Sequence, residues 1–595
     1  MTVLFLAPPL TSSAQSDQTR PGRRSKPTVL TKVLRTIDLN GDGMLSTEEI
    51  ASASASLAKL DRDQSGDLQI IELGGPGPFR GTLRFQPLIR VLDLNGDITI
   101  AAHELENASA ALLKLDRDGD QQVSKQELNF EKPVDPGFQA IPSPMRSVMS
   151  EYFSGIEGKI LPDSSSNAAD GYLLIHETSN HNDVQMGRHT YLVDKRGVVV
   201  HNWHNKRYSP ETSSAKLLAN GLLLRTVGNN DWIYREQYPL GAHGVLELVD
   251  WDGETLWQYK LDMPGRNVLH HDFELIPNGN ILVTAYVGFT VEEAAEIGFD
   301  PQLANGDIVW FESLIELVID IEKQSAKIAW QWNSWDHIIQ DEFPDKPNYG
   351  KISENPGRID VNATALKTLP FNSGEVHHIN SISYNEALDQ ILISSAATGE
   401  VWVVDHSTTR AEAATGKGGR ANQGGRLLYR WGNPAMIGDA DTPRSLFWQQ
   451  DAKWLKTAKD ESPKILLFNS GLRRTADGKY DENQEYLGIY EGYSDILEMA
   501  LPLTESGNYM LSSAPETVWN WNADNTESFY ALFAGGVSRL DNGHTLLVQS
   551  HTKRIIEITP EGERLLDFNF FGPGNIFTIE KLSPDYSGVA LLGSK

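Results

Sequence analysis

The chain has 595 residues, a formal net charge of −28 and no cysteine. This charge argues against nucleic acid or an anionic membrane surface as a partner, because there is no basic excess to neutralise phosphates. The lack of cysteine excludes disulfides, zinc thiolates and a thiol nucleophile, and it leaves the redox compartment open. At this length we expect several domains or one large closed architecture.

The first fifteen residues, MTVLFLAPPLTSSAQ, are a short apolar run followed by small residues near Ala14, which resembles the end of a secretory signal. We interpret residues 1–27 as a signal remnant and linker, and we expect a bacterial protein that is periplasmic or secreted. No later stretch is apolar for long enough to span a bilayer, so no integral membrane segment is expected.

Four acidic segments follow and form an internal duplication. They read DLNGDGMLSTEE at 38–49, DRDQSGDLQIIE at 61–72, DLNGDITIAAHE at 93–104 and DRDGDQQVSKQE at 116–127. Each later segment begins 55 positions after its counterpart, from 38 to 93 and from 61 to 116. Alternating oxygen-bearing residues closed by a glutamate resemble the EF-hand calcium loop, because a hard cation prefers oxygen ligands. We therefore interpret residues 28–131 as an EF-hand domain with two pairs of calcium loops.

The candidate calcium ligands take the oxygen-bearing positions of these loops. They are Asp38, Asn40, Asp42, Met44 through its carbonyl, Ser46 and Glu49; Asp61, Asp63, Ser65, Asp67 and Glu72; Asp93, Asn95, Asp97 and Glu104; and Asp116, Asp118, Asp120 and Glu127. The glycine of the mid-loop turn is present as Gly43 and Gly66, but Ile98 and Gln121 replace it later. A β-branched residue is poorly suited to positive φ, so the third loop is predicted to be distorted. The alternative interpretation is a solvated acidic surface. Residues 132–150 are rich in proline at their start and are predicted to form a linker.

From residue 171 onward the chain alternates short predicted strands with turns. One hairpin type ends on aromatic residues and recurs six times, for example as YLVDKRGVVVHNW and VLELVDWDGETLWQY. A second type lies between these copies, as in SSAKLLANGLLLR, HHDFELIPNGNILV and, more weakly, FTIEKLSPDYSGVALL. Asn-Gly at 220–221, 278–279 and 542–543 favours tight hairpin turns.

Two hairpins per repeat make a four-stranded unit, and about six units indicate a six-bladed β-propeller over residues 151–595. The fold class is therefore mainly β, with a small α-helical domain at the N-terminus. Trp203, Trp257 and Trp431 end successive strands and are interpreted as core packing. Residues 290–313 and 334–373 are interpreted as insertions between strands, and the first is partly helical at VEEAAEIG.

Histidine pairs open two of the second-type hairpins. His270 and His271 begin one and His377 and His378 begin the next, while Gln449 and Gln450 stand at the same place in the third. If these are inner strands of a propeller, equivalent positions point toward the axis, and histidines far apart in sequence meet there. Asp272 and Asn380 are close enough in sequence to orient an imidazole. The alternative is that each histidine only satisfies backbone groups at the start of a strand.

The segments HHDFELIPNGNIL, HHINSISYNEALDQILIS, VWVVDHSTT, LLYRWGNP, LFWQQDAKWL, GGVSRLDNGHTLL and IIEITPEGE occur in this order. Together they resemble the arylsulfotransferase family of PAPS-independent bacterial enzymes over most of residues 171–570. This resemblance implies a six-bladed propeller and sulfuryl transfer from an aryl sulfate to a phenol, through a sulfated histidine and without PAPS.

The resemblance also implies site residues. His271 matches the histidine of the family's HHD motif, and His378 matches that of its HIN motif, with Asn380 beside it. The family's sulfated histidine corresponds to Gln450, which has no nucleophilic nitrogen. The family's arginine or histidine after the paired serines corresponds to Ala396.

Basic residues near the predicted strand ends are candidates for holding a sulfonate, or else rim charges. They are Arg225, Arg473, Arg474, Lys553, Arg554 and, by proximity, His551.

The sequence leaves three functions open. The first is a divergent arylsulfotransferase in which His271 or His378 replaces the missing nucleophile. The second is a propeller enzyme with different histidine chemistry, and the third is a calcium-binding recognition protein without catalysis, which Gln450 and Ala396 favour. A small aryl sulfate or phenol is the expected partner in the first case.

Overall fold

The structure is a computed structural model of the whole chain. It describes residues 32–40, 42, 44–61, 65–68, 92, 100–116, 120–124, 167–178, 189–205, 214–228, 239, 241–263, 266–363, 374–457, 461–475, 478–480, 493–522, 529–531, 534–550, 553–570 and 575–593. The chain divides into two compact units, one N-terminal and one covering the rest, and each is described by itself. Among the described residues, no helix is long and apolar enough to cross a membrane.

The N-terminal unit consists of short helices around an apolar core. The helices are α1 (Lys32–Ile37), α2 (Thr47–Ala51), α3 (Ala53–Leu57), the 3₁₀ turn η1 (Ala58–Leu60), α6 (Ala102–Glu106) and α7 (Ala108–Leu112). Helix α2 begins in a capping box, in which Ser46 and Glu49 bond each other's backbone N–H groups. The core includes Val33, Ile37 and Leu57, all fully buried.

The acidic loops of this unit pair in a nested order, the outer two with each other and the inner two with each other. Leu45 in the first loop and Val123 in the fourth exchange backbone hydrogen bonds of 2.9 and 2.8 Å. Leu68 in the second loop and Ile100 in the third do the same, at 2.9 and 3.0 Å. The first loop therefore joins the fourth, and the second joins the third, although the first two loops are neighbours in sequence.

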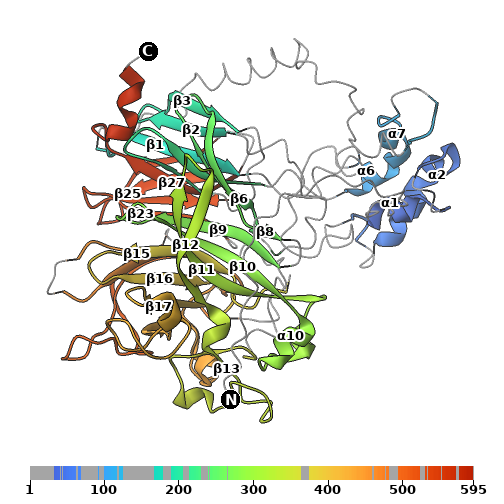
Figure 1. Cartoon of the computed structure of the whole chain (residues 1–595). Helices are drawn as coiled ribbons and strands as arrows, with labels where there is room; N and C mark the ends of the chain where they lie inside the picture. The colour runs from blue at the N-terminus through green and yellow to red at the C-terminus, as the bar shows by residue number, and fades with distance from the viewer. Residues whose placement is uncertain are drawn as a thin grey trace. The chain divides into compact units, whose positions relative to one another are not determined.

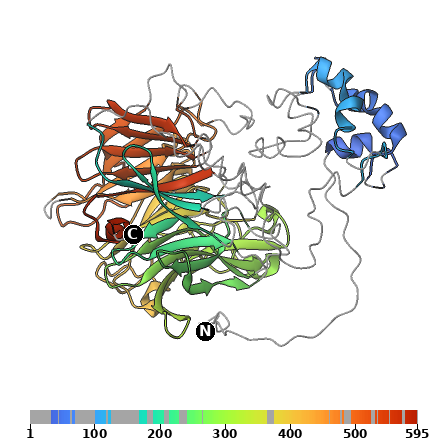
Figure 2. The same cartoon turned by 90° about the horizontal axis from the view of Figure 1, so that it is seen from above.

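The larger unit is a six-bladed β-propeller in which the described strands form six sheets of four or five strands (Figures 1 and 2). Blade 1 contains β27 (Asn575–Leu582), β1 (Tyr172–Thr178), β2 (His189–Asp194) and β3 (Val199–His204). Blade 2 contains β4 (Ala215–Leu217), β5 (Leu223–Gly228), β6 (Gly244–Val249) and β7 (Thr255–Lys260). Blade 3 contains β9 (Asn267–Leu275), β10 (Ile281–Thr290), β11 (Ile308–Asp320) and β12 (Ser325–Asn333), with β8 (Asp262–Met263) beside β9.

The other three blades follow the same plan. Blade 4 contains β15 (Ile379–Asn385), β16 (Gln390–Ser395), β17 (Glu400–Asp405) and β18 (Tyr429–Trp431). Blade 5 contains β19 (Gln450–Trp454), β20 (Lys464–Asn469), β21 (Asp495–Ala500) and β22 (Glu516–Trp521). Blade 6 contains β23 (Gly535–Arg539), β24 (Thr545–Gln549), β25 (Arg554–Ile558) and β26 (Arg564–Asn569).

The C-terminal strand closes the ring. Strand β27 pairs antiparallel with β1, from Tyr172 opposite Leu582 to Thr178 opposite Asn575, and so becomes the inner strand of blade 1 (Figure 1). The predicted final hairpin FTIEKLSPDYSGVALL is therefore wrong in detail. Only its first half is a strand, and the chain then turns into the 3₁₀ segment η8 (Ser587–Gly593). The missing partner comes from the start of the propeller, because ring closure satisfies the edge of β1.

Apolar clusters fill the space between each blade and the next. In the described residues, one buried cluster joins blades 1 and 2, and others join 2 with 3, 3 with 4, 4 with 5, 5 with 6, and 6 with 1. The strand-end tryptophans belong to these clusters, as the sequence predicted. The indole of Trp203 donates to the Asp250 carbonyl of the next blade (3.2 Å), and that of Trp257 donates to Ser325 (3.1 Å).

The two predicted insertions lie beside blades 3 and 4. The first is shorter than predicted, since β10 ends at Thr290 and β11 begins at Ile308. It contains the expected helix, α10 (Val291–Glu296), and the turn η3 (Pro301–Leu303). The second contains η4 (Ser334–His337), β13 (Ile338–Ile339), η5 (Ile352–Glu354) and β14 (Ile359–Asp360), and residues 364–373 lie outside the described part. Two short helical segments, α12 (Arg410–Ala413) and η6 (Pro434–Ile437), flank β18.

A histidine links blades 3 and 4. Nδ1 of His406 lies 2.8 Å from Asp389 Oδ1, and its Nε2 lies 3.2 Å from Glu316 Oε2. Burial alone would lower the pKa of His406, but the bonds to Glu316 and Asp389 outweigh it and raise this pKa above its ordinary value. Burial opposes ionisation of Glu316 as well, yet its pKa falls to about 2 because His406, Asn280 and Asn278 donate to it.

These shifts predict a pH window for stability. The raised pKa of His406 stabilises the folded state fully below the unfolded histidine value of about 6.5 and less as pH rises through the folded value. The lowered pKa of Glu316 stabilises the folded state above about pH 4.5, and this stabilisation decreases as the pH falls toward 2. We expect His406→Asn to lower the free energy of unfolding by about 1–2 kcal/mol near pH 5.5 and by less near pH 9. Urea unfolding at both pH values measures this, and an equal loss at both would contradict the assigned charge.

Candidate functional site

Two histidines occupy strained backbone positions on the inner strands, His271 in the middle of β9 and His378 directly before β15, so the prediction that both pairs open their strands is wrong for His271. His271 has φ of +45° and His378 has φ of +50°, a left-handed conformation that a residue with a Cβ adopts at a cost. The pairing of β9 with β10 shifts register between Val283 and Thr284, which leaves His271 in a bulge. A bulge turns a side chain away from the regular alternation of a strand. It accounts for the direction of the His271 ring.

The rings of His271 and His378 lie together, as the repeat alignment predicted. Their centroids are 4.7 Å apart with an interplanar angle of 72°. Gly241 packs against His271, and a Cβ at that position would lie 2.1 Å from the ring. Trp448 lies beside His378, with ring centroids 5.1 Å apart. Phe577 on β27 lies 6.2 Å from the His271 ring.

A buried chain of hydrogen bonds leads from a glutamate to His271. Glu312 Oε2 lies 2.8 Å from Nε2 of His270, and Nδ1 of His270 lies 2.9 Å from Nδ1 of His271. Glu312 Oε1 also accepts the backbone N–H of Ile379 at 2.8 Å. The Tyr286 ring stacks on His270 at 3.7 Å and holds it in place. We call Glu312, His270 and His271 the relay.

His378 has different partners. Its Nδ1 lies 3.3 Å from Glu375 Oε1 and 3.4 Å from the Tyr286 hydroxyl. Glu375 is 3% exposed, so its carboxylate sits beside the imidazole in a nearly dry environment. Burial, with Glu312 and Glu375 nearby, raises the pKa of Tyr286 well above its ordinary value, and this hydroxyl stays protonated.

The outer nitrogens of both rings face accessible space. Nε2 of His271 and Nε2 of His378 have no hydrogen-bond partner among the described residues. Neither atom is among the fully buried polar atoms without a partner, a group that does include both ring nitrogens of His377. Each Nε2 therefore keeps some solvent-accessible surface, although His271 and His378 are only 2% and 4% exposed.

The relay determines what His271 Nε2 can do. If Glu312 is ionised, His270 donates from Nε2 and accepts at Nδ1, so His271 donates from Nδ1 and carries a lone pair on Nε2. A proton or an electrophile taken up at His271 Nε2 then passes its positive charge back toward Glu312. Burial and the neighbouring histidines lower the pKa of His271 well below its ordinary value, and burial raises that of Glu312 well above. Because a raised pKa favours the protonated carboxyl, which would reverse both tautomers, the lone pair on His271 Nε2 exists only when Glu312 is ionised.

Other predicted residues have structural partners. Asn380 donates to the Gln449 carbonyl at 2.8 Å and does not orient an imidazole. Asp272 accepts the Ile382 N–H of blade 4 at 3.1 Å, so it joins blades 3 and 4. Gln450 begins β19 and is 2% exposed. The expected orienting groups are thus replaced by Glu312 and Glu375.

His377 is fully buried and lies away from the paired rings. Its ring packs edge-on against Trp402 at 5.6 Å and against Phe311 at 6.3 Å. Burial, with Arg430 nearby, lowers the pKa of His377 to about 3, so it is neutral. This histidine is a core residue of blade 4.

The predicted basic residues that the structure describes have partners of their own. Arg225 is buried and bonds Glu247 at 2.8 Å, so it is not at a strand rim. Arg474 forms a bidentate pair with Asp495 at 2.7 and 3.1 Å, and Arg473 lies 3.4 Å from the Tyr480 hydroxyl. Arg554 pairs with Asp567 at 2.6 and 2.7 Å, and Lys553 lies near Glu177. Ala396, which stands where the family has arginine or histidine, donates its backbone N–H to the His378 carbonyl.

Sequence reasoning missed Glu312, Tyr286, Glu375 and Trp448. The signal for Glu312 was available, since it interrupts the apolar run IVWFESLIELV of a strand buried on both faces. A carboxylate in such a run is rarely found without a partner. Tyr286 stands opposite Glu312 in the register of β10 and β11, which the sequence did not reveal.

The described acidic loops carry oxygen atoms of the kind that calcium prefers. Glu49 accepts backbone N–H groups of Leu39 (2.8 Å), Asn40 (3.1 Å) and Ser46 (2.9 Å). Burial alone would raise the pKa of Glu49, but these donors outweigh it and hold the pKa below its ordinary value. The glutamate is an anion that faces into its loop. In the described part of the chain, however, no three acidic or histidine side chains converge as metal ligands do.

The mid-loop turns match the requirement for positive φ. Gly66 has φ of +88°, and Gln121 has φ of +65° although it is not glycine. Gln121 donates its N–H to Asp116 at 2.9 Å, and Gly66 donates to Asp61 at 2.9 Å, as the same turn requires. The fourth loop therefore keeps this turn. Asp63, Glu72, Asp93, Asn95, Asp97, Ile98, Asp118, Glu127 and His551 lie outside the described residues.

Comparisons with known proteins fit this picture. A family model described as arylsulfotransferase (ASST) matches residues 160–562, and one described as EF hand matches residues 31–52. No curated protein matches the sequence. Similar solved structures include a protein of unknown function from Bacteroides caccae, with 12% identity, coverage of 69% of this chain and 98% of that chain, and a TM-score of 0.34. Another is a putative 6-phosphogluconolactonase from Bacteroides fragilis, with 9% identity, coverage of 71% of this chain and 100% of that chain, and a TM-score of 0.33. A periplasmic gluconolactonase from Pseudomonas aeruginosa is similar at 11% identity, 69% and 99% coverage and a TM-score of 0.33. At this level of similarity we draw no functional conclusion from them.

Proposed function

Because the chain belongs to the arylsulfotransferase family, we propose that its propeller transfers a sulfuryl group from an aryl sulfate to a phenol at the His271–His378 pair. Two observations support this proposal. Nε2 of His271, at the end of the buried relay, has no partner among the described residues, and the ring centroids of His271 and His378 are 4.7 Å apart. In the proposal His271 takes the role of the family nucleophile that Gln450 cannot perform.

In the first step the lone pair on His271 Nε2 attacks the sulfur of the aryl sulfate. The S–N bond forms as the S–O bond to the ring breaks, and the phenolate leaves with the bonding electron pair. His378, whose Nδ1 lies 3.3 Å from Glu375 Oε1, donates its Nε2 proton to that oxygen. The positive charge that develops on His271 is balanced through His270 by Glu312.

In the second step an acceptor phenol replaces the product. His378 Nε2, now neutral, takes the proton of the acceptor hydroxyl as its oxygen attacks sulfur. The S–N bond breaks, its electron pair returns to His271 Nε2, and the aryl sulfate product leaves. Both histidines then have their starting protonation.

Incubation of the full chain with a chromogenic aryl sulfate tests this function. We expect release of the chromophore to depend on an added phenol and to follow ping-pong kinetics. Release into water at the same rate without acceptor would indicate hydrolysis and overturn transfer. Binding of the aryl sulfate without any release would favour a recognition protein, for which Gln450 and Ala396 are the supporting observations.

The relay predicts a large effect of Glu312→Gln. An amide at this position would accept the Ile379 N–H through its oxygen and donate to His270, which reverses both histidine tautomers and places a proton on His271 Nε2. We expect kcat to fall by about 10²–10⁴-fold, the range typical of a lost base or a wrong tautomer.

Glu316→Gln is the matched control for this change. Glu316 is on the same strand and is almost buried, but it contacts His406 and two asparagines and not the relay. A similar loss of kcat in both variants would contradict the proposed role of Glu312. Unfolding curves of both variants show whether the fold is intact.

We also propose that the N-terminal unit binds calcium through its oxygen-rich loops. Asp38, Asn40, Asp42, the Met44 carbonyl and Glu49 would hold the ion in the first loop, and such an ion supplies a positive charge that ties the loop to its helices. The match of the EF-hand family to residues 31–52 supports this ligand set.

Calcium removal is expected to lower the melting temperature of residues 28–131. With free calcium at about 100 times its Kd, chelation removes about 2.7 kcal/mol of stability by mass action. We expect the affinity of the propeller for an aryl sulfate to stay nearly unchanged. Circular dichroism of the helical transition measures the melting temperature. Glu49→Gln should reduce the change in melting temperature that calcium causes. A large loss of aryl sulfate affinity on chelation would refute the independence of the two units.

A further inference from the structure

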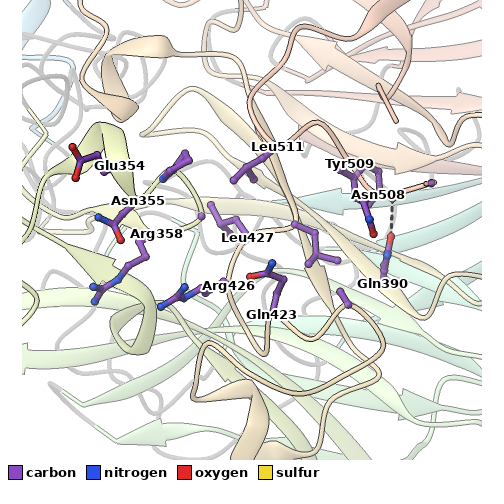
Figure 3. A pocket seen from close by; sticks show the side chains of 15 residues that line it. Glu354, Asn355, Arg358, Gln390, Gln423, Arg426, Leu427, Asn508, Tyr509 and Leu511 are labelled. Atoms are coloured by element: carbon purple, nitrogen blue, oxygen red, sulfur yellow. Dashed lines mark hydrogen bonds between the residues drawn. The ribbon is translucent and has the colours of Figure 1, made fainter. Parts of the chain in front are cut away.

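A pocket lies beside blades 4 and 5, where the segment 354–358, the loop 421–428 and the loop 507–511 meet (Figure 3). Its volume is about 480 Å³, within the range of small-molecule sites. None of its lining residues belongs to the relay, and none is His378, Glu375 or Tyr286. Its chemistry is therefore separate from the proposed transfer reaction.

Two arginines dominate one end of this pocket. In Figure 3 the side chains of Arg358 and Arg426 lie at the same end of the pocket, with the Asn355 side chain on the same side. Burial, and then the charge of Arg426, lowers the pKa of Arg358 below its ordinary value. The charge of Arg426 thus acts on Arg358, and two neighbouring like charges repel each other unless an anion lies between them.

No acidic side chain in the described part of the chain pairs with either arginine. Arg358 donates to the amide oxygen of Asn348 at 2.6 Å, and the Arg426 side chain has no hydrogen bond to a described residue. Glu354 lines the pocket, but its carboxylate bonds Lys351 at 2.8 Å and points away from the arginines in Figure 3. The positive charge of this end is thus not balanced within the pocket.

The arginines are held in position by the fold. Arg430 is buried, bonds Glu400 at 2.8 Å and donates to the carbonyl oxygens of Arg358 (2.7 Å) and Pro356 (3.3 Å). The Arg426 side chain lies against Gly416, where an added Cβ would be 2.4 Å from its Nε. Such preorganisation lowers the cost of ordering the cations when a ligand binds.

The rest of the pocket is apolar or uncharged. Leu427 and Leu511 line the middle, and the far end is closed by the hydrogen bond from the Tyr509 hydroxyl to Gln390 (2.7 Å; Figure 3). A ligand that reaches from the arginines across Leu427 therefore needs an anionic head and an apolar body. Paired guanidinium groups suit an oxyanion, because their N–H groups match its planar or tetrahedral oxygens.

We propose that this pocket binds a small amphiphilic anion, with its oxyanion group between Arg358 and Arg426 and a ring-sized apolar body on Leu427 and Leu511. Sulfate esters, sulfonates and carboxylates on an aromatic ring share this chemistry. The site is independent of the proposed transfer reaction and stands if that reaction fails.

Calorimetric titration of the full chain with 2-naphthalenesulfonate tests the site. A sulfonate has a carbon–sulfur bond and is not a sulfuryl donor, so the titration reports binding alone. The variant is Arg426→Gln, whose side chain has no other partner in the described structure. The matched control is Arg420→Gln, which removes the same charge six residues away and outside the pocket.

We expect one binding event to weaken by roughly tenfold or more in Arg426→Gln and to keep its affinity in Arg420→Gln, since a charge-assisted bond to the anion is lost. Any sulfonate bound at the histidines remains in both variants as a separate event. Equal binding in the wild type and in Arg426→Gln would overturn the site, as would equal binding of neutral 2-naphthol. Displacement by inorganic sulfate at matching concentration would overturn the amphiphilic assignment.

Discussion

His271→Asn is expected to abolish sulfuryl transfer, with kcat falling by at least about 10³-fold, because a covalent route has no substitute once its nucleophile is lost. Asparagine is the suitable replacement here. His271 has φ of +45°, and asparagine tolerates the left-handed region better than most residues. The backbone bulge, and with it the position of Asp272 and its bond to Ile382, should therefore survive.

The covalent intermediate makes this prediction specific. After a short incubation with a radiolabelled aryl sulfate and no acceptor, the wild type should carry label on His271, and His271→Asn should carry none. His378→Asn is the matched control, since His378 has φ of +50° and the same replacement is tolerated there. It should still become labelled, though more slowly, because it loses the acid and not the nucleophile.

The opposite pattern decides against the assignment. Label retained in His271→Asn and lost in His378→Asn would make His378 the nucleophile. That result would also remove the relay from the mechanism, because Glu312 and His270 act on His271 through Nδ1. Melting curves of both variants establish that neither has lost the fold.

A chain that stops before Asn575 is expected not to fold into a propeller. Strand β27 is the inner strand of blade 1, and its removal exposes the edge of β1. Ile576 and Ile579 belong to the cluster between blades 6 and 1, and Leu582 belongs to the one between blades 1 and 2. Burying three such side chains contributes about 1.5–3 kcal/mol each, a sum comparable with the whole stability of a typical domain.

A shorter truncation controls for simple loss of the C-terminus. A chain that stops after Leu582 keeps β27 and loses residues 583–595, which include η8, Val589 and the bond from Tyr586 to the Leu217 carbonyl. We expect this chain to fold with reduced stability. Cooperative unfolding followed by tryptophan fluorescence separates the two cases. A normal transition in the chain that stops before Asn575 would show that ring closure by β27 is dispensable.

The repeats made the architecture predictable. Asn-Gly turns, strand alternation and aromatic strand ends recur at intervals set by one four-stranded unit, and each of these signals depends only on neighbours in sequence. The order in which the ring closes was not predictable in this way. FTIEKLSPDYSGVALL satisfies the local pattern of a hairpin, but the unpaired edge of β1 competes for its first strand, and the interblade contacts decide the outcome.

The acidic loops show the same division. Their ligand pattern follows from the residues alone, and so does the mid-loop turn at Gly66. The turn at Gln121 does not, because a residue with a Cβ adopts positive φ there while its N–H bonds Asp116. The pairing of the first loop with the fourth also depends on how the helices pack.

For the site itself, the sequence determined which histidines stand at equivalent places, because the repeat carries that information along the chain. Only the tertiary structure decided how each is used. His271 and His378 face each other because a left-handed backbone conformation turns each ring, whereas His377, one residue away, is packed between Phe311 and Trp402. The choice of Glu312 over Asp272 as the group that governs His271 likewise depends on strand register and blade contacts. The spacing of residues in the sequence does not give the distances between side chains on different strands and blades. Those distances decide which groups share a proton with His271.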